Sequence, residues 1–179
     1  MSVLTDTTRL GLPTGTWSLD PVHSTIGFEL PYLAGTFRGH FPDVDAKLTE
    51  EILTGSARVA SVDVKDENLA AHLQSPDFFD VERYPELKFE SRELERSGER
   101  LTVRGDLTIR GVTKPVELTG TISEPLTDYA GRERVGLKLE TTVDRTDFGV
   151  NWNMALPNGE PALGNEVKLV AELYFVREA

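Results

Sequence analysis

Three histidines, His23, His40 and His72, offer the widest range of chemistry in this sequence, because imidazole can transfer protons near neutral pH or bind a metal. No two of them have the close spacing that places a zinc-binding pair on one helix face, so we expect no metal site. His23 lies in the segment DPVHS, where we expect it to hydrogen-bond a turn. His72 adjoins Leu73 on a predicted helix, where it either presents a polar atom at a pocket mouth or is a half-buried ring.

The sequence supports catalysis by a nucleophile or by a pair of carboxylates no better than it supports catalysis or metal binding by histidine. The serine nucleophile pattern G-x-S-x-G is missing, and the chain contains no cysteine for thiolate or disulfide chemistry. Asp43 and Asp45, like Asp144 and Asp147, form pairs of carboxylates, but such pairs carry little information among 30 acidic residues. We therefore predict no catalytic residue, no cofactor and no enzymatic reaction.

Composition narrows the classes of partner. The 179 residues carry a formal net charge of −11, which repels phosphate backbones and anionic membrane surfaces, so nucleic acid is not an expected partner. No stretch is apolar over the length of a membrane span, and we expect no stable membrane insertion. The first residues lack the basic start and the apolar core of a signal peptide, which predicts a cytoplasmic protein.

The elements that must position any site are strands. Apolar and polar residues alternate through much of the chain, most clearly over residues 101–109, 135–143 and 167–175. Turn residues separate these segments, so the pattern predicts eight or nine antiparallel strands in a barrel or sandwich. The alternation changes phase at Ala60 and Ser61, where we expect a β-bulge.

One segment departs from this alternation. Residues 66–75 have helical spacing, with Asp66 as the expected N-terminal cap. Pro76 ends this helix and starts a short turn that carries Phe78 and Phe79. We expect these two rings to lie over one end of the barrel.

A barrel of about eight strands either fills with side chains or holds one small ligand, and alternation alone does not decide between the two. A long apolar pocket would suit a hydrocarbon chain, because each buried CH₂ contributes about 0.8 kcal/mol. Aromatic rings come from segments that we place outside the regular strands: Phe37, Phe41, Phe78, Phe79, Phe148 and Trp152. They either line such a pocket or plug an ordinary core.

Several segments, spread in order along the chain, resemble one known family. The most specific is HLQSPDFFDVERYPELKFES, which is similar to the family pattern H-L-x-S-x-D-F-F-D-x-x-x-Y-P-x-x-x-F-x-S. Others are TWSLDPVHSTIGFEL, GTFRGHFPDVDAKL, LTIRGVTKPVELTG and TTVDRTDFGVNW. On these segments the chain resembles the YceI-like proteins, a lipocalin-like family of polyisoprenoid-binding proteins. It departs from the family pattern at Ala70 and Ala71, where relatives often have Arg-Asp.

The resemblance implies an all-β fold: an extended antiparallel eight-stranded lipocalin-like barrel with a short helical insertion near residues 66–80. We expect residues 1–14 to be a flexible tail and residues 15–179 to be a single YceI-like domain. The resemblance also implies a lipid chain in the barrel, no established catalytic reaction and a homodimer as a common assembly.

The leading functional hypothesis is a carrier or storage protein for a long-chain isoprenoid or similar lipid, of polyprenyl or quinone type. An enzyme acting on a small apolar substrate in the barrel, with His72 or an aspartate as base, and a structural module without ligand are the alternatives. The predicted ligand-binding residues combine the inward phase of the strands with the aromatic segments: Ile26, Phe28, Phe37, Phe41, His72, Leu73, Phe78, Phe79, Tyr84, Phe89, Leu107, Leu118, Leu139, Phe148, Trp152 and Leu169.

Overall fold

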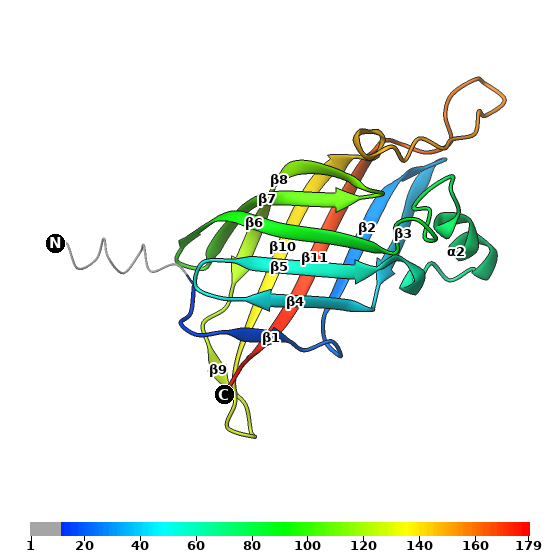
Figure 1. The fold of residues 1–179 in the computed structure, drawn as a ribbon. Coiled ribbons are helices and arrows are strands. Elements are labelled where there is room, and N and C mark those ends of the chain that lie inside the picture. The colour runs from blue at the N-terminus through cyan, green and yellow to red at the C-terminus, as the bar shows by residue number, and fades with distance from the viewer. Residues whose placement is uncertain (1–11) are drawn as a thin grey trace.

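Antiparallel strands and one short α-helix make up the fold in a computed structural model that describes residues 12–179 (Figure 1). Eight strands close into a barrel, because β11 pairs with β10 on one side and with β1 on the other. In order around the barrel they are β11 (Glu166–Arg177), β1 (Trp17–Leu19), β4 (Val44–Leu48), β5 (Leu53–Arg58), β6 (Glu86–Ser97), β7 (Arg100–Ile109), β8 (Val112–Ile122) and β10 (Glu133–Asp144). The predicted all-β barrel is confirmed.

Alternation places one face of each strand inside the barrel. On β10, Val135, Leu137 and Leu139 are buried, whereas Lys138 between them is exposed. β10 pairs with β11 along nearly its whole length, and this pairing places Leu137 opposite Leu173. Burial of these apolar side chains is the main stabilising contribution of such a sheet, and the polar face meets water.

Three further strands extend the sheet: β2 (Thr25–Tyr32), β3 (Gly35–Phe41) and β9 (Leu126–Thr127). β2 pairs with β11 beyond the end of β1, and β3 pairs with β2 along its whole length. Phe37 and Phe41 therefore lie on a strand, and their placement outside the strands was wrong. Glycines break the apolar alternation of this segment, and Gly39 is needed because a Cβ there would lie 2.6 Å from the Phe28 ring.

The expected β-bulge at Ala60 and Ser61 was also wrong. The chain instead forms a 3₁₀ turn, η1 (Val59–Ser61), which is closed by a 3.1 Å hydrogen bond from Val62 N to Val59 O. This turn shifts the alternation by changing the chain direction, and it buries Val59. The register irregularity of the sheet lies elsewhere, between Ser91 and Glu93 on β6.

The predicted helical insertion is confirmed as α2 (Glu67–Gln74), which stands at one end of the barrel (Figure 1). The Asp66 carboxylate accepts a 3.0 Å hydrogen bond from Leu69 N and so caps the helix, as its position in the sequence predicts. After the helix the chain folds back tightly, with a 2.9 Å hydrogen bond from Phe79 N to Leu73 O. This fold-back brings the Phe78 and Phe79 turn over the end of the barrel.

The interior divides into two apolar clusters. At the end away from α2, side chains fill the barrel around Trp17, Leu48 and Phe175, which are at most 1% exposed. Leu12 joins this cluster at 7% exposure, whereas residues 1–11 of the predicted tail lie outside the described residues. The second cluster gathers apolar residues of β2, β3 and α2 at the other end. The barrel is therefore plugged at one end and lined by aromatic rings at the other.

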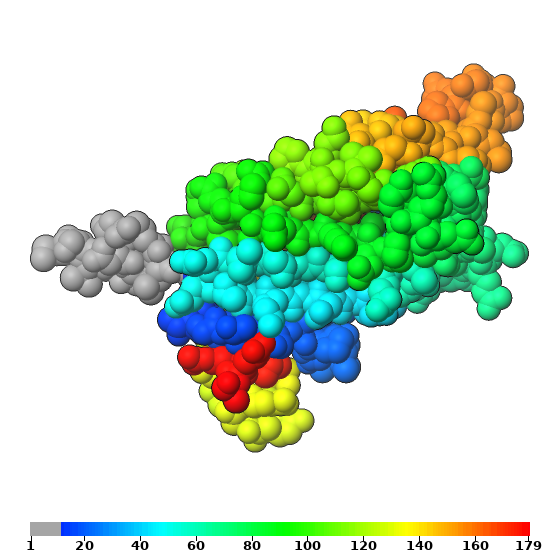
Figure 2. Space-filling model, in the orientation of Figure 1, coloured from blue at the N-terminus to red at the C-terminus, as the bar shows by residue number. Residues whose placement is uncertain are grey.

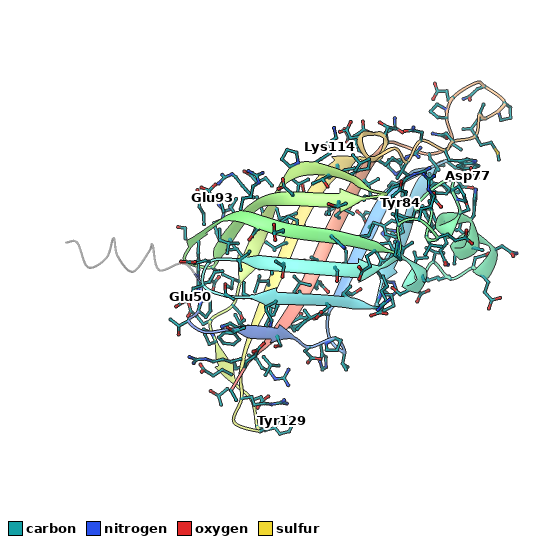
Figure 3. All side chains as sticks on the ribbon, viewed as in Figure 1. Glu50, Asp77, Tyr84, Glu93, Lys114 and Tyr129 are labelled. Carbon is teal, nitrogen blue, oxygen red and sulfur yellow. The ribbon has the colours of Figure 1, made fainter. Side chains whose placement is uncertain are left out.

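The outer surface is continuous over the strands in the view of Figure 2, where β4 to β7 form a wall without an opening and residues 151–162 project at one end. Charged side chains such as Glu93 and Lys114 cover this outer face (Figure 3). No helix among residues 12–179 combines the length and the apolar composition needed to cross a membrane.

An ion-pair cluster ties the β1–β2 turn to the β9–β10 hairpin. Arg134 donates to Asp20 Oδ2 at 3.0 Å and to Asp128 Oδ2 at 2.6 Å, and His23 Nδ1 lies 2.8 Å from the same Asp20 oxygen. The expected turn role of His23 is thus confirmed. The hydrogen bond with His23, and then that from Arg134, lowers the pKa of Asp20 to about 2. The bond from Arg134 is the main reason that the pKa of Asp128 also falls to about 2.

We expect this cluster to make stability depend on acid pH. Both folded pKa values lie below the ordinary value of 3.8, so the stabilisation is complete above about pH 4 and is lost as the pH falls through 2. Arg134→Gln should flatten this dependence in urea unfolding between pH 2.5 and 5. Lys114→Gln removes the same charge from the outer face of β8 and should leave the dependence unchanged. If the free energy of unfolding changed equally with pH in the two variants, Arg134 would not be the cause of the acid sensitivity.

Candidate ligand cavity

A cavity of about 410 Å³ occupies the half of the barrel nearer α2. This volume is within the range of small-molecule sites, roughly 300–1,000 Å³. Its floor is formed by Leu118, Leu139 and Leu173, which belong to or pack against the apolar plug. Its other end is bordered by α2 and by the irregular segment after η2 (Arg145–Phe148). The barrel is therefore neither fully filled nor hollow throughout.

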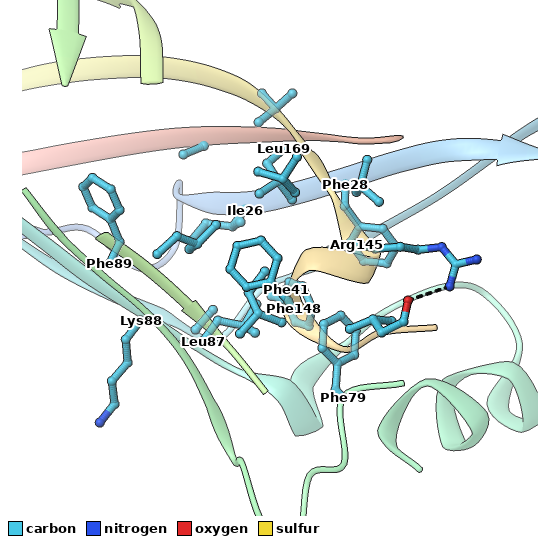
Figure 4. Close-up of a pocket in the computed structure, with 18 of the residues that line it drawn as sticks. Ile26, Phe28, Phe41, Phe79, Leu87, Lys88, Phe89, Arg145, Phe148 and Leu169 are labelled. Carbon is cyan, nitrogen blue, oxygen red and sulfur yellow. Dashed lines mark hydrogen bonds between the residues drawn. The ribbon is translucent and has the colours of Figure 1, made fainter. Parts of the chain in front are cut away.

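Aromatic rings in edge contact shape the middle of the cavity (Figure 4). The Phe41 ring lies 5.6 Å from the Phe28 ring and 5.6 Å from the Phe79 ring, in tilted and edge-to-face arrangements respectively. Leu87 and Leu169 face the same space, whereas the Lys88 side chain points away from it (Figure 4). Such a surface offers dispersion contacts and gives almost no hydrogen bonds to a ligand.

The helical end carries the main polar pair of the site. The His72 ring contacts Phe78 and Trp152 edge to face, with centroids 5.0 Å and 4.8 Å away. Its Nε2 lies 2.9 Å from Asp77 Oδ2. The His72 side chain is 34% exposed, and Asp77 lies on the outer surface at this end (Figure 3). His72 is therefore a half-buried ring that also lines the cavity, which combines the two roles left open by the sequence.

Except for Tyr84, all predicted ligand-binding residues line the cavity. Tyr84 instead packs on the turn between β7 and β8, where a Cβ on Gly111 would lie 2.6 Å from its ring. Figure 3 shows Tyr84 beside the strand ends at the helical side. That the lining residues bind a ligand remains a prediction.

Sequence reasoning missed several lining residues. Leu30, Leu87 and Ile109 share the inward phase of residues that were predicted, so alternation could have identified them. Val150 and Leu163 lie in irregular segments whose position depends on tertiary contacts, and no periodicity marks them.

Arg145 is the buried charged residue among those that line the cavity, at 5% exposure. Its guanidinium donates to the backbone carbonyl oxygens of Gly164, Val150 and Trp152 at 2.8–2.9 Å. One of these bonds is drawn in Figure 4. Burial lowers the pKa of Arg145, because the charged form loses its hydration. The three bonds hold the irregular segments against the end of the barrel.

The side chains that face the cavity offer mainly apolar contacts. Within the described residues, no group of three His, Cys, Asp or Glu side chains is arranged to hold a metal ion. The His72–Asp77 pair lies at the rim, and the space behind it is apolar. An elongated hydrocarbon group would fit these surfaces.

The sequence model of the YceI-like domain matches residues 17–175. The chain belongs to the YceI-like family. Among its relatives, a UPF0312 protein of Pseudomonas putida strain W619 is 36% identical over 137 residues, covering 72% of this chain and 71% of the relative. A UPF0312 protein of Photorhabdus laumondii is 32% identical over 158 residues, covering 84% of this chain and 82% of the relative.

Solved structures show the same fold as this YceI-like chain. BcnA of Burkholderia cenocepacia superposes with a TM-score of 0.76 at 20% identity, covering 87% of this chain and 98% of BcnA. A polyisoprenoid binding domain from Saccharophagus degradans superposes with a TM-score of 0.68 at 12% identity, covering 90% of this chain and 98% of that domain. At these identities the likeness establishes the barrel and does not by itself assign a ligand.

Proposed function

We propose that this YceI-like chain binds a long-chain isoprenoid or a similar lipid, of polyprenyl or quinone type, inside the barrel and serves as its carrier or storage protein. The observation that carries the proposal is the apolar cavity between the plugged end and α2. A buried segment of about ten carbons contributes roughly 8 kcal/mol before the entropy cost of association is subtracted. The structural likeness to a polyisoprenoid binding domain supports the same class of ligand. The homodimer and the cytoplasmic location stay predictions.

Tryptophan fluorescence tests the proposal directly. Trp152 lines the cavity, whereas Trp17 is buried in the plug, so a Trp17→Phe variant leaves one reporter at the site. Titration with polyprenols of increasing length should change its emission saturably, with one ligand per chain and affinity that rises with length until the cavity is full. No saturable change with any polyprenol or quinone would contradict the proposal.

A binding role and a catalytic role differ in their dependence on His72. We expect His72→Ala to weaken lipid binding by less than about tenfold, because the ring contributes contacts at the rim while most of the buried area lies deeper. The measurement is the fluorescence titration, with Asp77→Asn as the matched variant that keeps the ring and alters its partner. If His72→Ala instead abolished a conversion of the bound ligand, detected by mass spectrometry, the enzymatic alternative would replace the carrier.

A further inference from the structure

Two exposed apolar segments meet at the end of the molecule that carries α2. One is the turn between β2 and β3, and the other is the projecting segment 151–162, orange in Figure 1. Backbone hydrogen bonds join them, because Leu33 N donates to Ala162 O at 3.0 Å and Ala162 N donates to Met154 O at 2.8 Å. Leu33 is 57% exposed, Met154 59% and Tyr32 44%. We call Tyr32, Leu33 and Met154 the rim patch.

The rim patch is continuous with the cavity. Tyr32 lines the cavity and forms an isolated backbone bridge with Leu163, which is also a lining residue. From Tyr32, ring contacts lead inward through Phe37 to Phe28, with centroid distances of 6.5 and 5.9 Å. Trp152 lines the cavity from the projecting segment. A hydrocarbon chain that enters at this end therefore passes the rim patch before it reaches the rings of the interior.

Charge is scarce around the rim patch, although the protein is strongly acidic. Residues 31–36 contain no charged side chain, and Glu160 alone is charged in residues 151–164, whereas 27% of the whole chain is charged. The net charge of −11 repels anionic surfaces. An uncharged apolar patch on such a protein instead complements a surface that has no net charge.

The backbone of Leu33 indicates that this leucine does not serve folding alone. Its φ is 52°, in the left-handed region that leucine adopts at an energetic cost and that glycine or asparagine adopts readily. An exposed leucine gains little from burial within its own chain. Strained residues of this kind gather at functional sites. The leucine is accounted for if a surface outside the chain buries its side chain.

We propose that the rim patch docks this protein reversibly on the zwitterionic surface of a phospholipid bilayer, where the lipid ligand enters and leaves the cavity. The inference rests on the proposed function, because an isoprenoid chain resides in bilayers and dissolves poorly in water. Tyrosine and tryptophan favour the boundary between head groups and hydrocarbon, where Tyr32 and Trp152 would lie. Leu33 and Met154 would bury their apolar side chains at shallow depth, and no segment would cross the membrane.

Phosphatidylcholine vesicles test the docking by sedimentation with the unmodified protein and matched variants. Leu33→Asn should weaken vesicle binding about tenfold, because a buried leucine side chain is lost. Its unfolding temperature should stay the same or rise, because asparagine tolerates the left-handed backbone. Val22→Asn changes an apolar residue that is 83% exposed beyond the other end of β2, and it should bind vesicles as the unmodified protein does. Stronger binding when phosphatidylglycerol is added would contradict docking on a neutral surface.

Two routes of lipid delivery separate docking from binding in the cavity. Leu33→Asn should take up geranylgeraniol from phosphatidylcholine vesicles about tenfold more slowly. Its affinity for geranylgeraniol delivered from methyl-β-cyclodextrin should be unchanged, since Leu33 does not line the cavity. An unchanged uptake rate from vesicles, or an unmodified protein that does not sediment with them, would overturn the docking and leave lipid binding intact. Binding by neither route would count against the proposed function itself.

A second variant and a mass measurement distinguish the bilayer from another copy of this chain. Met154→Asn, on the neighbouring segment, should show the same loss of vesicle binding and of uptake rate as Leu33→Asn. Light scattering in the absence of vesicles should give one molar mass for the unmodified protein and both variants. If the variants lowered the molar mass, the rim patch would join two copies of the chain, and the bilayer proposal would be wrong.

Discussion

Replacing Ala171 by phenylalanine should abolish lipid binding. Ala171 lines the cavity from the middle of β11, opposite Leu139 of β10 and Ile26 of β2 in the sheet register. A phenyl ring at this position would take the space of a ligand segment. Displacing about four CH₂ groups costs roughly 3 kcal/mol of binding free energy, which is more than a hundredfold in affinity.

The matched control is Lys168→Phe, which places the same ring on the outward face of the same strand. Lys168 is 45% exposed and extends towards Glu140, so the substitution leaves the cavity unchanged. Lipid titration followed by Trp152 emission should give the unmodified affinity for this control. Thermal unfolding of both variants shows whether the barrel is intact, since overpacking usually costs about 1–3 kcal/mol. An Ala171→Phe protein that is folded and binds lipid as before would show that the ligand lies outside this cavity.

Gly120→Ala should be the most destabilising small substitution in the barrel. A Cβ at Gly120 would overlap the carbonyl oxygen of Lys138 and would lie 3.1 Å from Leu139 Cα, on the neighbouring β10. Both contacts are with backbone, which cannot rotate away as a side chain does. β8 pairs with β10 over a short stretch only, and that pairing closes the barrel. We expect a loss of about 3 kcal/mol or more in the free energy of unfolding, measured with urea.

Gly136→Ala is the control, because it adds the same methyl group on β10. Its Cβ would lie 3.3 Å from ring carbons of Tyr174, a side chain that is partly exposed and can move. We expect a change of less than about 1 kcal/mol there. Equal stabilities of the two variants would contradict the close approach of β8 and β10.

The regular part of the fold could be predicted from local patterns. Alternation on β10 and β11 reflects the pleat itself, and Asp66 at the start of α2 reflects the unpaired N–H groups of a helix end. The inward phase of those strands then indicates Leu139 and Leu169 as cavity residues. These features depend on neighbours within a few residues, which is why the sequence alone contains them.

Features that arise from the closed barrel could not be read in this way. Phe37 and Phe41 lie on a glycine-interrupted strand that β2 holds in place. At Gly120 the backbone of the neighbouring strand leaves no room for a Cβ, which no local pattern indicates. Tyr84 was grouped with the aromatic segment but packs on a distant turn. The position of Arg145 depends on three carbonyls in the irregular segments after η2, which no periodicity marks. Each depends on contacts that form only after the strands are paired.

Native mass spectrometry of the protein purified from its own host, followed by solvent extraction and lipid analysis, tests the central claim most directly. The cavity between the plug and α2 predicts a co-purified isoprenoid at one molecule per chain, and Ala171→Phe should lack it. The same spectrum would give the chain length and the head group. A ligand-free mass that stays unchanged after incubation with quinones and polyprenyl phosphates would contradict the account.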